Sequence, residues 1–185
     1  MRKIITSALV TLDGVAEDPG GYGGTSFGGW ALPYFGEESV RLSIEALAGC
    51  DYFLCGRRTY EMFAAAWGNA EGPYGDRLRS LRKLVASSTL KGDLTWNAEL
   101  LEGDTIAALK QLKKQDGGDI IMYGNPTLLR SLLANDLVDE LDLMLHPVLL
   151  GTGQKLFADD TPQTKLALNN QTALDNGVTI LSYRI

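Results

Sequence analysis

The chain has 185 residues, a length typical of one domain with a full hydrophobic core. Hydrophobic residues make up 45% of it and charged residues 22%, which predicts a globular protein and excludes a chain kept disordered by polar bias. Because the net charge is −6, the protein has no general positive field, and we expect neither a nucleic-acid partner nor binding to an anionic membrane.

Short segments of the sequence indicate the cellular compartment of the protein and the state of its cysteines. No apolar run reaches the roughly 18 residues needed to cross a bilayer, and the segment Met1 to Thr6 lacks the apolar core of a signal peptide. We therefore expect a cytoplasmic protein. Cys50 and Cys55 are the only cysteines, and their apolar surroundings predict buried thiols. With His146 as the sole histidine, we expect no protein-ligated metal.

The first predicted elements are a strand and a long loop. Residues 3–12 form a short apolar run with β-branched members, which predicts a buried strand ending at Asp13-Gly14. Seven glycines between residues 14 and 29 predict a loop, because regular structure would cost them too much backbone entropy. The aromatic residues in or beside this loop are Tyr22, Phe27 and Trp30. It is either a lid that closes over a ligand or a passive surface insertion.

The middle of the chain alternates between helical and strand patterns. Apolar residues at helical spacing, with Glu37 and Glu38 in the first turn, predict a helix over 37–48. Further strands are predicted over 52–56, 84–86, 94–96 and 120–123, and further helices over 57–66, 105–114 and from Leu128 to Leu133. Asn125 is suited to cap that last helix and Pro126 to occupy its first position.

The C-terminal part changes character. Apolar and other residues alternate over 141–146, which predicts a strand in which His146 is a packed or rim residue. Gly151-Thr152-Gly153 is interpreted as a turn, and two strand-like runs within 166–185 predict a closing hairpin. Strands that alternate with helices and then become antiparallel predict one α/β domain over 1–185, with a mixed sheet and helices on both faces.

Two strand-to-helix junctions look suited to anions. Gly56-Arg57-Arg58-Thr59 and Gly124-Asn125-Pro126-Thr127 each begin with a glycine that lets a ligand approach the backbone. Each also opens a helix whose N–H groups and dipole favour phosphate. In open α/β sheets, ligands bind where such junctions meet, outside the carboxyl ends of the strands. Taken singly, each junction also has an ordinary explanation, because glycine and a capping residue commonly start helices.

Three ordered segments are more specific than either junction alone. They are Gly56 to Glu61 (GRRTYE), Val85 to Thr89 (VASST) and Tyr123 to Pro126 (YGNP). In this order they resemble the G-R-x-T-x-E turn of dihydrofolate reductases, the next strand end, which reaches the adenosine 2′-phosphate, and the third junction of that fold. From Gly124 to Gly153 the chain resembles the reductase domain at the C-terminus of bifunctional riboflavin-biosynthesis proteins.

This resemblance implies a three-layer α/β/α dihydrofolate-reductase-like fold, with a mostly parallel mixed sheet and an antiparallel C-terminal hairpin. It implies an NADPH-dependent reductase, a homodimer, that transfers hydride to a small heterocyclic or sugar-imine substrate such as a 5-amino-6-(5-phosphoribosylamino)uracil-like compound. The implied cofactor contacts are Gly56, Arg57, Thr59, Ser87, Ser88, Gly124, Asn125 and Thr127. Asn125 is a departure, since relatives often have a second glycine there; its side chain could hydrogen-bond the pyrophosphate or crowd it.

The residues expected to contact the substrate differ from those of true dihydrofolate reductases. Trp30-Ala31-Leu32-Pro33 is similar to their W-x-L-P segment, but Phe35 stands where an acidic residue is expected, and an apolar ring cannot recognise a protonated pteridine. Trp30 and Phe35 are therefore candidate contacts for a different substrate. Asp13 is the preferred candidate for proton handling, with a turn at Gly14 as its alternative role. Glu37 or Glu38 could supply an acid only if their helix were shifted, and otherwise they are charges of the first helical turn. A non-catalytic nucleotide- or small-ligand-binding protein on the same scaffold is the second hypothesis.

Overall fold

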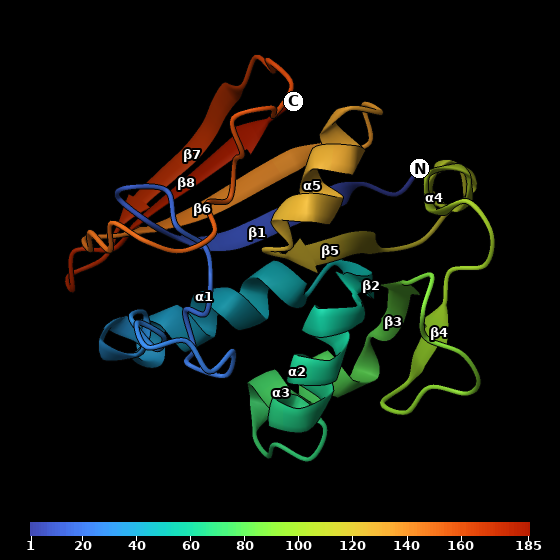
Figure 1. Ribbon diagram of the computed structural model, residues 1–185, viewed down its shortest axis with the longest axis horizontal. Helices are drawn as coiled ribbons and strands as arrows, with labels where there is room; N and C mark the ends of the chain where they lie inside the picture. The colour runs from blue at the N-terminus through green and yellow to red at the C-terminus, as the bar shows by residue number, and fades with distance from the viewer. The chain divides into compact units, whose positions relative to one another are not determined.

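The computed structural model describes residues 1–185 (Figure 1). The chain divides into two compact units, and each contains four of the eight strands. The first unit comprises Met1–Ile4 and Glu37–Met122, and the second comprises Ile5–Gly36 and Tyr123–Ile185. Both units are assembled from segments that lie far apart in the sequence. The single domain expected over 1–185 stays a prediction.

The first unit is built on parallel strands. They are β2 (Cys50–Gly56), β3 (Arg82–Ala86), β4 (Ala98–Leu100) and β5 (Asp119–Tyr123), in the order β4-β3-β2-β5. Its helices are α1 (Glu37–Leu47), α2 (Arg57–Trp67), α3 (Pro73–Ser80) and α4 (Thr105–Lys113). Consecutive residues of β2, β3 and β5 are fully buried, such as Phe53 and Leu54, so both faces of these strands are covered.

The second unit contains the antiparallel part of the sheet. Its strands are β1 (Ile4–Thr11), β6 (Glu140–His146), β7 (Ala167–Ala173) and β8 (Thr179–Arg184), in the order β1-β6-β8-β7. The pair β1 and β6 is parallel, whereas β8 is antiparallel to both β6 and β7. A short 3-10 helix, η1 (Leu32–Tyr34), and α5 (Pro126–Leu133) complete the unit.

Most predicted elements are confirmed, as is the α/β fold with a mixed sheet and a closing antiparallel hairpin. The predicted strand over 94–96 is wrong. Trp96 and Asn97 have φ values of 62° and 52°, and this left-handed backbone cannot continue a strand, so β4 begins at Ala98. Helix α3 was absent from the predicted elements, although Pro73 at its first position was an available signal.

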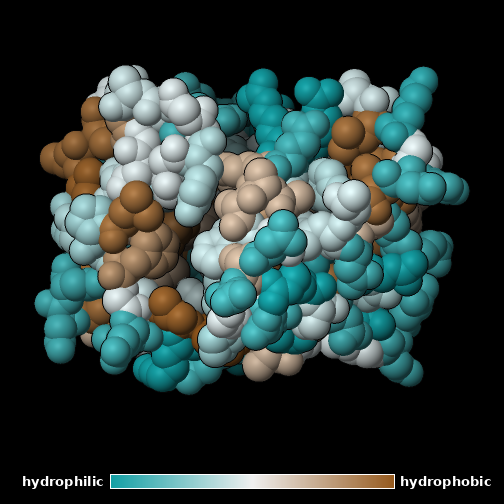
Figure 2. Space-filling model, turned by 90° about the horizontal axis from the view of Figure 1, so that it is seen from below, coloured by the Kyte–Doolittle hydropathy of each residue, from teal (hydrophilic) through white to brown (hydrophobic).

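Hydrophilic side chains separate the hydrophobic patches on the face shown in Figure 2. None of the helices combines the length and the apolar character that spanning a membrane requires. Cys50 and Cys55 are buried free thiols, as predicted.

A buried lysine closes the C-terminal end of α3. Lys83 on β3 is fully buried, and its ammonium group donates to the carbonyl oxygens of Leu78 at 2.5 Å, Leu81 at 2.8 Å and Arg79 at 3.1 Å. The same nitrogen lies 4.1 Å from the ring centre of Trp96. Burial lowers the pKa of Lys83 to about 8. One cation therefore satisfies carbonyl oxygens that the helix itself leaves without donors.

We expect Lys83→Met to lower the free energy of unfolding at neutral pH by about 2 to 4 kcal/mol, because buried carbonyl groups lose a charged donor. The deficit should grow as the pH rises above about 8, since the unfolded chain keeps the lysine proton to higher pH than the folded chain does. Urea unfolding at pH 7 and at about pH 9 measures both effects. Lys91→Met, at an exposed lysine, is the control; equal deficits for the two variants would contradict this role.

Candidate functional site

The first predicted junction lies at the end of β2. Gly56 precedes α2 without a side-chain cap, so the N–H groups of the first helical turn have no side-chain acceptor. Arg57 is exposed; its Nη1 donates to Oγ1 of Thr89 at 3.1 Å, and its Nε lies 3.5 Å from Oε1 of Glu61. Helix α2 thus opens with free backbone donors beside a guanidinium group, an arrangement that suits an anion.

The end of β3 lies beside this turn, because β2 and β3 are parallel neighbours with Gly56 opposite Ala86. Oγ of Ser87 accepts from the N–H groups of Thr89 at 3.2 Å and Leu90 at 3.1 Å, which shapes the loop that Arg57 contacts. The implied cofactor residues that the first unit gathers here are Gly56, Arg57, Thr59, Ser87 and Ser88.

The second predicted junction joins β5 to α5. Gly124 and Asn125 are both left-handed, with φ values of 56° and 59°. Oδ1 of Asn125 accepts from the N–H of Leu128 at 3.4 Å, and Pro126 follows at the first helical position, which confirms the predicted cap. The other side-chain atom, Nδ2 of Asn125, is buried without a hydrogen-bond partner. An unmet buried donor costs about 1 to 3 kcal/mol, so this amide favours a ligand that brings an acceptor.

A pocket of about 260 Å³ adjoins this junction in the second unit. Its lining residues are Pro126, Thr127 and Arg130 of α5, with Gln154, Lys155, Phe157, Ala158 and Asp159 from the segment after β6. Nη1 of Arg130 is held by Oδ2 of Asp160 at 2.8 Å, whereas the ammonium group of Lys155 has no ion-pair partner. The pocket therefore offers a free cation beside Thr127. Sequence patterns did not single out Lys155, because its proximity to α5 is a tertiary contact.

Asp13 links the end of β1 to the segment after β6. Its Oδ1 accepts from the hydroxyl of Thr11 at 2.6 Å, its Oδ2 accepts from the N–H of Gly151 at 2.7 Å, and the N–H of Leu150 lies 3.3 Å from each oxygen. These bonds, that of Thr11 foremost, lower the pKa of Asp13 to about 2. At neutral pH Asp13 is therefore an anion with both oxygens engaged. Its part in proton handling stays a prediction.

Trp30 and the 3-10 helix surround the only histidine. The ring centres of Trp30 and Tyr34 lie 5.3 Å and 5.4 Å from that of His146, each in an edge-to-face arrangement. His146 is 2% exposed, as the packed interpretation predicts, and burial lowers its pKa. Nε1 of Trp30 donates to the carbonyl of Glu17 at 2.8 Å. Trp30 is thus 7% exposed and presents little surface to a substrate, whereas Phe35 is 45% exposed.

The glycine-rich loop is organised around one carboxylate. Asp18 accepts from the N–H of Gly23 at 2.6 Å, the N–H of Thr25 at 3.1 Å and the hydroxyl of Thr25 at 2.9 Å. Burial acts to raise the pKa of Asp18, but these donors outweigh it and hold the pKa below its ordinary value. Sequence patterns missed Asp18, although an acidic residue among glycines with free N–H groups is a usable signal.

We expect Asp18→Ala to speed hydrogen exchange across residues 20–29 without ligand, because the N–H groups of Gly23 and Thr25 lose their shared acceptor. Thr25→Val removes only the hydroxyl donor and is the matched control, with a smaller effect. Since the pKa of Asp18 is lowered, the wild-type loop should keep its protection above about pH 4 and lose it as the pH falls through the folded-state pKa. Unchanged exchange in Asp18→Ala would contradict the loop's dependence on this residue.

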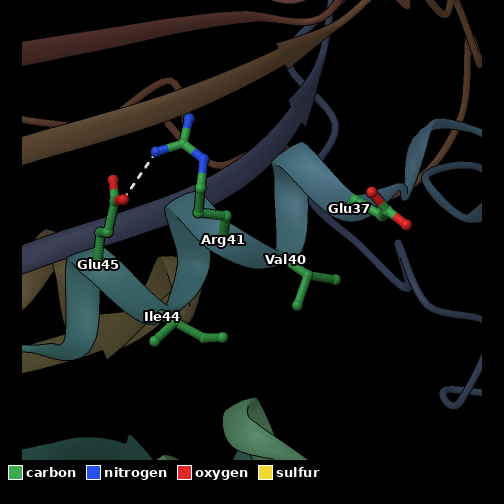
Figure 3. A pocket seen from close by; sticks show the side chains of 5 residues that line it. All are labelled: Glu37, Val40, Arg41, Ile44 and Glu45. Atoms are coloured by element: carbon green, nitrogen blue, oxygen red, sulfur yellow. Dashed lines mark hydrogen bonds and ion pairs between the residues drawn. The ribbon is translucent and has the colours of Figure 1, made fainter.

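Helix α1 carries a separate hollow of about 520 Å³ (Figure 3). It is lined by Glu37, Val40, Arg41, Ile44 and Glu45. Val40 and Ile44 extend from one side of the helix, and Arg41 pairs with Glu45 at 2.7 Å on another. The hollow contains none of the residues that the sequence analysis assigned to a cofactor or substrate.

The fold is that of an α/β protein with a mixed sheet, and comparison with known proteins shows which family the chain belongs to. The chain belongs to the RibD C-terminal domain family, whose model matches residues 2–180. It is 30% identical to the uncharacterized protein YyaP of Bacillus subtilis over 190 residues, which cover 98% of this chain and 94% of that protein.

Solved structures support the fold assignment. One is a Thermotoga maritima diaminohydroxyphosphoribosylaminopyrimidine deaminase/5-amino-6-(5-phosphoribosylamino)uracil reductase, with a TM-score of 0.64 and 15% identity, covering 99% of this chain and 56% of that one. Another is the Schistosoma mansoni dihydrofolate reductase, with a TM-score of 0.64 and 12% identity, covering 99% of this chain and 98% of that one. The dihydrofolate-reductase-like fold expected from the sequence is confirmed.

Proposed function

We propose that this protein is an NADPH-dependent reductase that transfers hydride to a small heterocyclic or sugar-imine substrate, such as a 5-amino-6-(5-phosphoribosylamino)uracil-like compound. The observation that carries the proposal is membership of the RibD C-terminal domain family over nearly the whole chain. The Thermotoga maritima neighbour is named as a 5-amino-6-(5-phosphoribosylamino)uracil reductase as well as a deaminase.

The residues at both junctions fit a pyrophosphate-bearing cofactor. In the first unit, the uncapped start of α2 and the exposed guanidinium of Arg57 would hold phosphate groups. In the second unit, the unpartnered Nδ2 of Asn125 supports hydrogen bonding to a ligand oxygen over crowding of the ligand. NADPH, when bound, supplies a hydride from its nicotinamide ring.

Reduction of a C=N bond adds hydride to carbon and a proton to nitrogen. Asp13 carries no proton at neutral pH, because its pKa is about 2. His146 is buried, and its pKa is lowered from the ordinary value, so it too is neutral at that pH. The proton therefore comes from solvent in this mechanism, while Asp13 holds the end of β1 against Leu150 and Gly151.

The same observation about Asp13 favours a second candidate. A scaffold in which Asp13 is ionised could bind a nucleotide or a small ligand and not turn it over. Turnover distinguishes the two candidates, since only the reductase consumes NADPH.

We expect NADPH to bind at least about tenfold more tightly than NADH, because a charge-assisted hydrogen bond to the 2′-phosphate is worth about 1.5 to 3 kcal/mol. Arg57→Met should bring the two dissociation constants close together, measured by fluorescence titration. Arg58→Met, at the adjacent exposed arginine, is the control and should keep most of the preference. Equal affinities in the wild type would contradict a 2′-phosphate contact.

We expect NADPH to be oxidised when the protein is offered pterins, ribosylaminopyrimidines and small carbonyl compounds, with the ribosylaminopyrimidines the best substrates. Loss of NADPH absorbance measures the reaction. A protein with Arg57→Met should need more NADPH to reach the same rate. If NADPH binds but no compound is reduced, the binding-protein candidate replaces the reductase.

A further inference from the structure

The segment that joins β3 to β4 has no buried side chain of its own to hold it in place. It covers residues 87–97 and contains no helix or strand (Figure 1), and none of its residues is buried. Its first turn is local, because Oγ of Ser87 accepts from the N–H groups of Thr89 and Leu90. Ser88, an implied cofactor contact, lies in this turn and is exposed. The position of Ser88 therefore depends on the polar contacts that hold the segment.

Tyr60 of α2 holds the far end of this segment. Its hydroxyl oxygen accepts from the N–H of Thr95 at 3.1 Å, and it lies 3.2 Å from both the carbonyl oxygen and Oγ1 of that residue. Because Tyr60 is only 7% exposed, water competes little for these bonds. The two residues are 35 positions apart in the sequence, and both belong to the first unit. The attachment is therefore a tertiary contact within one unit.

Helix α2 contacts the same segment a second time. Nη1 of Arg57 donates to Oγ1 of Thr89 at 3.1 Å, near the beginning of the segment. Arg57 and Tyr60 are three positions apart in α2, so they lie on one side of the helix. The Arg57 bond is exposed to water, whereas the Tyr60 bonds are partly buried. Tyr60 is consequently the firmer of the two attachments.

We propose that Tyr60 is a positioning residue of the cofactor site, whose hydroxyl holds residues 87–95 in the conformation that receives the 2′-phosphate of NADPH. This inference rests on the proposed function, because it takes Arg57 and Ser88 as the contacts of that phosphate. Fixing a loop costs backbone entropy, and a loop that is already ordered loses less entropy when a ligand binds. The tyrosine of the GRRTYE motif thus acts through the segment and not on the ligand.

Hydrogen exchange tests the attachment without any cofactor. Tyr60→Phe removes one hydroxyl and leaves the ring in place, so we expect faster exchange across residues 88–95 and little change in β2 or β3. Tyr52→Phe is the matched control, because Tyr52 lies near the beginning of β2, whereas α2 follows the end of that strand. This control should leave the exchange of the segment unchanged.

Cofactor affinity tests the consequence for binding. In Tyr60→Phe we expect the dissociation constant of NADPH to rise about three- to tenfold, because the ligand must now order the segment. NADH lacks the 2′-phosphate, so its dissociation constant should rise less than about twofold. Thr95→Val removes only Oγ1 and keeps both backbone groups, and its effect on NADPH should be smaller. Fluorescence titration measures both cofactors, and circular dichroism checks that each variant is folded.

Three results would count against the positioning role. Unchanged exchange across residues 88–95 in Tyr60→Phe would show that the hydroxyl does not hold the segment. If the wild type binds NADPH, then unchanged NADPH affinity in Tyr60→Phe, or an equal loss for NADPH and NADH, would overturn this inference alone, since a merely structural change affects both cofactors. A wild type that binds no NADPH would overturn the proposed function and this inference together.

Discussion

Backbone N–H groups that no helix or sheet ladder satisfies are the constraint on the loops and junctions of both units. A chain with so many loop and junction residues must satisfy these donors without a regular ladder. In the second unit the acceptors are carboxylates: Asp13 receives the N–H groups of Leu150 and Gly151, and Asp18 receives those of Gly23 and Thr25. At the start of α2 no side chain performs this task, and the donors remain available to a ligand.

The hydrogen bonds that Asp13 and Asp18 accept also affect the pKa values of these two carboxylates. A carboxylate that accepts several hydrogen bonds is held in its ionised form, because the donors stabilise the charge. Asp13 and Asp18 are consequently structural anions, whereas a general acid at neutral pH needs a raised pKa. The same bonds that position the loops thereby favour the ionised form of both acids. The proposed chemistry depends on the cofactor and on solvent protons.

The two junctions differ in how the unpaired N–H groups at the start of the helix are capped. Asn125 caps α5 with its own side-chain oxygen and leaves its nitrogen without a partner, whereas Gly56 leaves the start of α2 uncapped beside Arg57. One junction therefore presents a directed amide donor and the other a cluster of backbone donors with a positive charge. Each junction by itself therefore offers a different kind of donor to an anionic or oxygen-bearing group.

The sequence by itself determined the elements whose signals are local. The cap of Asn125 with Pro126, the acidic first turn of α1 and the alternation in β6 act between near neighbours, so they can be recognised without the fold. The residue motifs also identified the family. The resemblance located the strand end at Ser87 beside Arg57, and the parallel pairing of β2 with β3 placed them there.

Only the tertiary structure decided the roles that join distant residues. Asp13 accepts from a residue 138 positions along the chain, and no local pattern reveals that bond or its effect on the pKa. The apolar character of Trp96 favoured a strand in the sequence analysis. Its packing over Lys83 and its left-handed backbone depend on the tertiary structure, so the sequence did not reveal them. Local propensity determines backbone conformation where the interacting residues are close in the sequence. Where a hydrogen-bond donor or an aromatic ring contacts a residue distant in the sequence, tertiary packing determines the conformation.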